Sequence, residues 1–205
     1  MPKSYLPFLV LVSALSCSKG EAPKKALQAP VKAVKMSKDK TTQAPAPKTQ
    51  LSPEKLKVLH DNVDRYTSGV RTLISSLQSN TPASSVAEAA LSLTNLGVEI
   101  TSGMAQAHPQ CAQYFQALAD AAPKLPDLDL ATLERDYHEG KALPKNPSRV
   151  CYHGKDLVVH PGTVAAIARM GLKTKDLRDK AIAELNEVIA HGLQVKMALK
   201  PSQKP

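Results

Sequence analysis

Two stretches of this chain carry apolar residues at alternating steps of three and four positions, the spacing that places side chains on one face of an α-helix. The first stretch follows Ser52-Pro53-Glu54, in which a hydroxyl cap precedes a proline at the first helical position. This pattern predicts a long amphipathic helix with one narrow apolar seam. The seam consists of Leu56, Leu59, Val63, Tyr66, Val70, Leu73 and Leu77.

A second stretch of the same kind begins after Asn80-Thr81-Pro82, which interrupts the helical pattern. Two amphipathic helices joined by a short turn form an antiparallel hairpin. The apolar phase continues from Cys111 to Ala121, beyond His108-Pro109, so either the helix kinks at the proline or a new helix starts there. The apolar positions of the second stretch are Val86, Ala89, Leu93, Leu96, Ile100, Gly103 and Ala107.

The later part of the chain has shorter patterns. Asp129 is placed to cap a short helix that Gly140 ends. Val150–Val159 has the composition of an extended segment, although the chain offers no second strand to pair with it. Pro161 is expected to open a further helix, and Thr174 to cap the last one. The sequence therefore predicts an all-α, bundle-like domain.

The N-terminal residues form a separate unit. Lys3 is followed by a mostly apolar run from Tyr5 to Leu15, which is too short to cross about 30 Å of hydrocarbon as a helix and is typical of a signal peptide. The run ends in Ala14-Leu15-Ser16-Cys17, which resembles the signal of bacterial lipoproteins. The resemblance implies cleavage before Cys17, lipid on its sulfur and anchoring in the cell envelope. Ser18 favours the outer membrane over the inner one, with the domain facing the periplasm.

Residues 17–52 join the predicted lipidated cysteine to a segment rich in Lys, Pro and Ala. Such a segment buries too little apolar surface to offset the entropy of ordering, so we expect a disordered tether. It carries most of the net positive charge of the chain. The expected division is therefore a signal peptide at 1–16, the lipid-bearing tether at 17–52, a helical domain at 53–195 and a basic tail at 196–205.

Two cysteines remain if Cys17 carries lipid. In an exported protein Cys111 and Cys151 are expected to pair, because the envelope is an oxidising compartment. Such a bridge would stabilise the fold by about 4 kcal/mol through loop entropy. Metal ligation and a reactive thiol remain as alternatives. The middle of the domain is therefore predicted to be an irregular segment linked by a disulfide, with His108 and His153 close to it.

Residues 108–160 hold four of the six histidines together with both of these cysteines. Neutral imidazoles are common ligands of zinc, copper and iron, so these histidines, with Asp136 or Asp156, are candidates for a metal or haem site. The interpretation that the sequence favours is that they pack and hydrogen-bond around the disulfide. His60 and His191 stand alone on predicted helices, and we assign them no role. The four candidates are His108, His138, His153 and His160.

The remaining composition narrows the function. With five tyrosines, two phenylalanines and no tryptophan, the chain offers no stacking platform for nucleic acid. Neither Gly-x-Ser-x-Gly nor the haem-attachment signature Cys-x-x-Cys-His occurs, so we expect no enzyme and no cofactor. We expect an envelope-anchored lipoprotein whose domain is a non-catalytic binding or scaffolding module, contacting an envelope protein or a second copy through the seam of the first helix. The alternative is a periplasmic metal- or haem-binding protein that uses residues 108–160.

Overall fold

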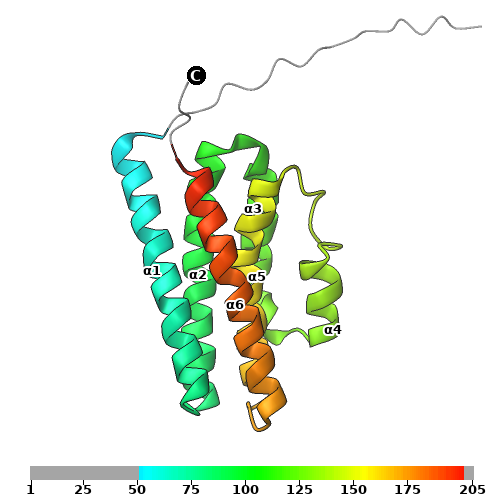
Figure 1. Cartoon of the computed structure of the whole chain (residues 1–205). Helices are drawn as coiled ribbons and strands as arrows, with labels where there is room; N and C mark the ends of the chain where they lie inside the picture. Colours follow the sequence, from blue (N-terminus) through cyan, green and yellow to red (C-terminus); the bar gives the residue numbers. More distant parts are fainter. Residues whose placement is uncertain (1–50, 201–205) are drawn as a thin grey trace, which may run out of the picture. The chain divides into compact units, whose positions relative to one another are not determined.

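The structure, a computed structural model, describes residues 51–200. Within this range the chain forms six α-helices and no strand, which confirms the predicted all-α fold (Figure 1). None of these helices has both the length and the apolar content that a membrane span requires. The predicted signal peptide and Cys17 lie outside the described residues, as do residues 18–50 of the tether. The helices are α1 (Pro53–Gln78), α2 (Ala83–Ala107), α3 (Ala112–Ala121), α4 (Leu130–Leu133), α5 (Arg149–Arg169) and α6 (Lys175–Ala198).

The hairpin of α1 and α2 forms as its apolar pattern predicts. The side chain of Ser52 accepts a hydrogen bond from the backbone N–H of Lys55 at 3.3 Å, and Pro53 starts the helix. The turn to α2 passes through Asn80, which has a positive φ of 56°. The apolar seam of α1 is buried, and α1 packs against both α2 and α6 (Figure 1). The chain itself therefore covers the face that the sequence left open for a partner.

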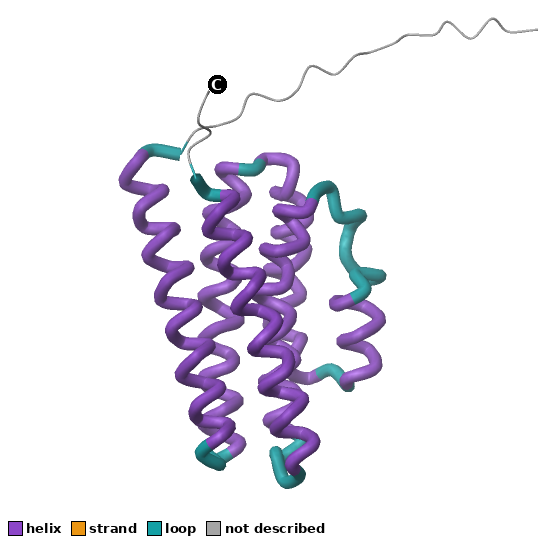
Figure 2. The backbone as a smooth tube through the Cα atoms, viewed as in Figure 1, coloured by secondary structure: helices purple, strands orange, loops and turns teal. Residues whose placement is uncertain are grey.

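The connection from α2 to α5 consists of short helical turns and a loop (Figure 2). A 3₁₀ turn, η1 (Pro109–Cys111), separates α2 from α3, so a new helix starts at the proline. A second 3₁₀ turn, η2 (Ala122–Asp127), follows α3. Asp129 caps α4 by accepting a hydrogen bond from the N–H of Thr132 at 2.9 Å. The chain continues as a π-helical turn, η3 (Glu134–His138), and Gly140 follows with a positive φ of 78°.

Two expectations for the region of α5 are wrong. Val150–Val159 is not extended, because it belongs to the single helix α5, and Pro161 lies inside that helix rather than at its start. Every residue of α5 from Gly154 to Ala168 is buried, under α2, α6 and the turns between them. A helix that is covered on all sides is buried around its whole circumference, so its apolar residues are not confined to the one-sided spacing by which α1 and α2 were predicted.

The proline inside α5 is accommodated by two neighbouring helices. Because Pro161 has no N–H, the carbonyl of Leu157 lacks its helical donor. The hydroxyl of Tyr66, fully buried on α1, donates a hydrogen bond to this carbonyl oxygen at 2.7 Å. Gly97 of α2 lies against the same carbonyl, and a Cβ atom at this position would come within 2.3 Å of the oxygen. A side chain of α1 and a glycine of α2 therefore both accommodate the carbonyl group that Pro161 leaves without a donor.

The predicted disulfide is confirmed. Cys111 and Cys151 are bonded, with their Cα atoms 5.4 Å apart, so the end of η1 is fixed to the first turn of α5. The start of the basic tail needs a correction, because α6 continues to Ala198. Lys196 is held in this helix by an ion pair with Asp64 of α1, at 2.6 Å from Oδ2. Residues 201–205 lie outside the described part of the chain.

We expect Tyr66→Phe to lower the free energy of unfolding by about 1–3 kcal/mol, because it leaves the Leu157 carbonyl buried without a donor. Urea unfolding of the full-length protein measures the change. Tyr114→Phe is the matched control, since this tyrosine is also buried but its hydroxyl makes no hydrogen bond among the described residues. Equal losses for the two variants would contradict the role of Tyr66.

Candidate metal centre

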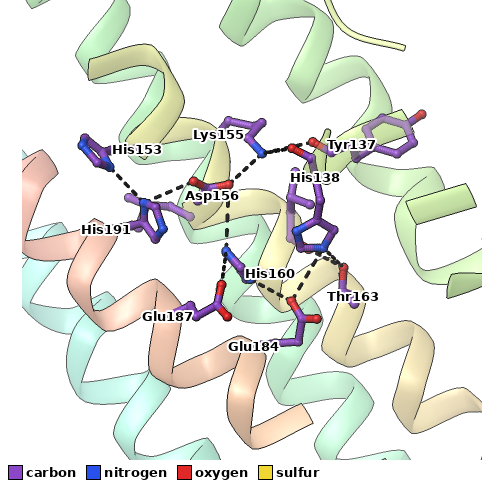
Figure 3. A network of polar contacts seen from close by, with 12 residues as sticks. Tyr137, His138, His153, Lys155, Asp156, His160, Thr163, Glu184, Glu187 and His191 are labelled. Carbon is purple, nitrogen blue, oxygen red and sulfur yellow. Dashed lines mark hydrogen bonds and ion pairs between the residues drawn. The ribbon is translucent and has the colours of Figure 1, made fainter. Parts of the chain in front are cut away.

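Polar side chains line one side of the buried helix α5. Asp156, His160 and Thr163 recur at steps of four and three residues, so they share one helix face. Each of them is at most 4% exposed. This face meets α6 and the π-helical turn η3, whose own polar residues point toward it (Figure 3). Buried polar groups need partners inside the protein, and the contacts among these three elements supply them.

Lys155 connects α5 to η3. Its side chain is 2% exposed, and its ammonium group donates hydrogen bonds to the carbonyl oxygens of Tyr137 at 3.1 Å and His138 at 3.0 Å. The same nitrogen lies 2.8 Å from Oδ1 of Asp156. Carbonyl groups at the C-terminal end of a helix have no helical donor, and here a buried lysine binds two of them at the end of η3 (Figure 3). These bonds place His138 beside His160.

The first group of candidate ligands surrounds one nitrogen of His160. Nδ1 of His160 lies 2.7 Å from Oε2 of Glu184 on α6. Nε2 of His138 lies 3.6 Å from the same oxygen and 3.0 Å from the hydroxyl of Thr163. One ligand atom from each of His138, His160 and Glu184 lies within 4.8 Å of the others. Residues from η3, α5 and α6 therefore converge on one point, which we call the first ligand group.

A second group lies on the other side of the same imidazole. Nε2 of His160 is 3.9 Å from Oδ1 of Asp156, and Nδ1 of His191 is 3.1 Å from Oδ2. This Oδ2 atom is buried and accepts no hydrogen bond from the described residues. Asp156, His160 and His191 again offer ligand atoms within 4.8 Å of one another, and we call them the second ligand group. His153 touches its edge, with its Nδ1 at 3.0 Å from Nδ1 of His191.

The electrostatics of both groups suit a cation. Burial lowers the pKa of His138 and of His191, although the negative charges of Glu184 and Asp156, respectively, oppose this effect. Burial also lowers the pKa of His153. A lower pKa favours the neutral imidazole, which is the form that binds a metal ion. Three carboxylates, those of Asp156, Glu184 and Glu187, face the ammonium of Lys155 and the histidines (Figure 3). With neutral histidines, Asp156, Glu184 and Lys155 leave one net negative charge, and Glu187, which is 68% exposed, adds a second one at the solvent side.

The donor set and its spacing match a transition-metal ion. Imidazole nitrogen with carboxylate oxygen is a common donor set for zinc and neighbouring divalent ions. At metal–ligand distances of about 2.0–2.1 Å, tetrahedral ligands lie roughly 3.3 Å apart. In the first ligand group, Oε2 of Glu184 is 2.7 Å from one imidazole nitrogen and 3.6 Å from the other. Small side-chain movements would admit an ion between them.

The structure brings together only some of the residues that the sequence singled out. His138, His160 and Asp156 meet in these groups, and His153 lies at their edge. His108 ends α2 and belongs to neither group. Asp136 instead pairs with its neighbour Arg135, at 2.7 Å.

Sequence analysis missed the contribution of α6, namely Glu184, Glu187 and His191. Glu184 and His191 are seven residues apart, so they share a face of the predicted last helix. That spacing was the available signal. It became meaningful only when α6 packed against the polar face of α5. Comparisons with protein-family models, curated proteins and solved structures found no match to this chain.

We expect the stability of the metal-free protein to fall as the pH is lowered from 7.5 to 5.5. The pKa values of His138, His153 and His191 are lower in the folded protein than the usual value near 6.5. The unfolded chain therefore binds more protons in this range, and acidification favours unfolding. Urea unfolding of the full-length protein in EDTA measures the slope.

His191→Asn tests the origin of this pH dependence. It removes one of the three histidines, so stability should fall less steeply with acidification than in the wild type. A slope that stays the same in this variant, or a wild-type stability that does not change with pH, would contradict the assignment.

Proposed function

We propose that this protein is an envelope-anchored lipoprotein whose helical domain binds a divalent transition-metal ion, with zinc as the representative ion. The observation that carries the proposal is the convergence of His138, His160 and Glu184 from three separate elements on one buried point. The role is binding rather than catalysis, in keeping with the expectation of a non-catalytic module. No substrate or further cofactor is part of the proposal.

Metal binding accounts for the charges better than packing alone. Buried charges are costly unless they are paired. Within residues 51–200, Lys155 pairs with Asp156, whereas the charged contacts of Glu184, which is 15% exposed, are all with imidazoles. A divalent cation would compensate the excess negative charge. Packing around the disulfide, which the sequence favoured, gives no reason for carboxylates to gather on these histidines.

The geometry favours a metal ion without a macrocycle over haem. The oxygen of Glu184 contacts the imidazole nitrogens of both His138 and His160. Haem would need those two nitrogens on opposite faces of a flat macrocycle, with no carboxylate between them. A small metal ion can bind all three of these ligand atoms at the same time.

The location of the protein is proposed from its N-terminal sequence. The lipoprotein-like Ala14-Leu15-Ser16-Cys17 supports a lipid on Cys17, and Ser18 favours the outer membrane. The disulfide between Cys111 and Cys151 supports export, because such bonds persist in oxidising compartments. We propose that residues 18–52 tether the domain on the periplasmic side of the membrane.

The expected envelope protein partner, or second copy of the chain, remains a prediction. The seam of α1 was its expected contact, and that seam is buried within the domain. A partner would therefore contact a different face. The metal proposal does not depend on it.

The metal proposal predicts that the full-length protein binds Zn²⁺ and that ligand variants weaken this binding by at least about tenfold. The variants are His138→Gln and Glu184→Gln, each of which removes one atom of the first ligand group. Isothermal titration calorimetry measures the affinities. His60→Gln is the matched control, because this histidine lies on α1 and belongs to neither group. Absence of binding by the wild type, or equal affinities for all variants, would overturn the proposal.

The anchoring proposal predicts that Cys17→Ser moves the protein from the membrane fraction to the soluble periplasmic fraction. The reason is that serine offers no sulfur for the lipid. Fractionation of cells followed by intact mass measurement checks it, since the wild type should carry the added mass of the lipid. Cys111→Ser is the control, and it should leave the membrane association intact. A wild type without lipid, or membrane binding that persists in Cys17→Ser, would refute the anchor.

A further inference from the structure

The imidazole of His160 has candidate metal ligands on both of its nitrogens. Nδ1 faces Glu184 at 2.7 Å, and His138 contacts the same carboxylate oxygen. Nε2 faces Oδ1 of Asp156 and Oε2 of Glu187, each at 3.9 Å. The two sides differ in every residue except His160 itself (Figure 3).

We infer that the domain binds two divalent transition-metal ions and that His160 bridges them. The first ion is the one proposed above, held by Nδ1 of His160 with His138 and Glu184. The second ion is held by Nε2 of His160 with Asp156 and His191. This inference rests on the proposed function and adds a second site to it. With metal–nitrogen bonds of about 2 Å on either side of one imidazole ring, the ions would lie roughly 6 Å apart.

A buried carboxylate oxygen points to the second ion. No group of the described residues donates a hydrogen bond of regular geometry to Oδ2 of Asp156, although the residue is 1% exposed. It lies 3.1 Å from Nδ1 of His191, a separation close to that of two ligands on one ion. A buried polar atom without a hydrogen bond is costly and calls for a cause, and a bound cation supplies one.

The surroundings indicate how the second ion would enter. Glu187 is 68% exposed and lies 3.9 Å from Nε2 of His160, so it offers a carboxylate at the solvent side of this ligand group. His153 contacts Nδ1 of His191 at 3.0 Å. To bind an ion, His191 must release this contact and turn its lone pair to the metal. The imidazole of His153 is then free to hydrogen-bond to solvent.

The two sites should differ in affinity. The ammonium of Lys155 lies 2.8 Å from Oδ1 of Asp156, so it already compensates part of the negative charge of the second ligand group. Repulsion from this ammonium weakens the second site. The carboxylate of the first ligand group has no lysine among its described contacts, and Lys155 reaches this group only at the backbone carbonyl of His138. We therefore expect one tight and one weaker binding step.

Bridging also requires a proton to leave. A neutral imidazole carries one N–H proton and has one free lone pair, so it can bind one ion without change. Coordination of the second ion through the other nitrogen displaces the N–H proton of His160 to solvent. The bridging group is then an imidazolate, which links the two ions electronically.

Metal titration of the full-length protein tests the inference, with Cys17→Ser in every sample to remove the one thiol outside the disulfide. Native mass spectrometry counts bound Zn²⁺. The parent protein should bind two ions, His191→Gln one, and His160→Ala none. Asp156→Asn should also bind one ion. The second site is then tested by one variant on α5, Asp156→Asn, and by one on α6, His191→Gln. Circular dichroism of each variant checks that the helices are retained.

Copper gives a direct test of the bridge. The first equivalent of Cu²⁺ should give a normal electron paramagnetic resonance signal, and the second should reduce the total signal, because an imidazolate couples the two spins. A total signal that doubles with two bound ions would overturn the bridge. One bound Zn²⁺ in the parent protein would overturn the second site and leave the proposed function standing. No bound Zn²⁺ would refute both.

Discussion

The burial of α5 on every side is the constraint on which the rest of this structure depends. From Gly154 to Ala168 the helix has no exposed residue, yet this stretch includes charged side chains and a proline. Each polar group on it must therefore find a partner inside the protein. The neighbouring helices are arranged to provide these partners, and the position of the helix fixes the position of the candidate site.

Different neighbours of α5 meet this demand in different ways. Toward α1 and α2, a tyrosine hydroxyl satisfies the carbonyl freed by Pro161, and Gly97 lets the backbones approach. Toward α6 and η3, the helix presents a lysine, an aspartate and a histidine. Replacing buried charged residues by apolar residues of similar size often leaves a protein at least as stable. The presence of charged groups there is therefore better explained by a ligand than by stability, and the proposed ligand is a metal ion.

The sequence predicted those parts of the fold whose pattern is local. The seam of α1 faces the core and so appears as regular spacing, and Asp129 and Thr174 cap helices where their short polar side chains suggested. The helix α2 was predicted, but its buried face differs from the expected one because α2 packs against both α1 and α5. Of the expected positions, Ala89, Leu96, Gly103 and Ala107 are only partly buried. Only the part of α5 after Pro161 was predicted as a helix, because the apolar residues before it form a continuous run rather than a one-sided pattern, and Pro161 resembled a helix start. The site was half predicted for a related reason. His138 and His160 lie in the histidine-rich middle, whereas Glu184 and His191 reach them only through packing of α6.

We propose that a metal ion lies between His138, His160 and Glu184. The most direct test is X-ray diffraction from crystals of the protein grown with Zn²⁺, with data collected at the zinc absorption edge. The account predicts an anomalous difference peak within bonding distance, about 2.0–2.2 Å, of one atom from each of these three side chains. Crystals without a peak at this point, in which His160 still donates its hydrogen bond to Glu184, would contradict the account.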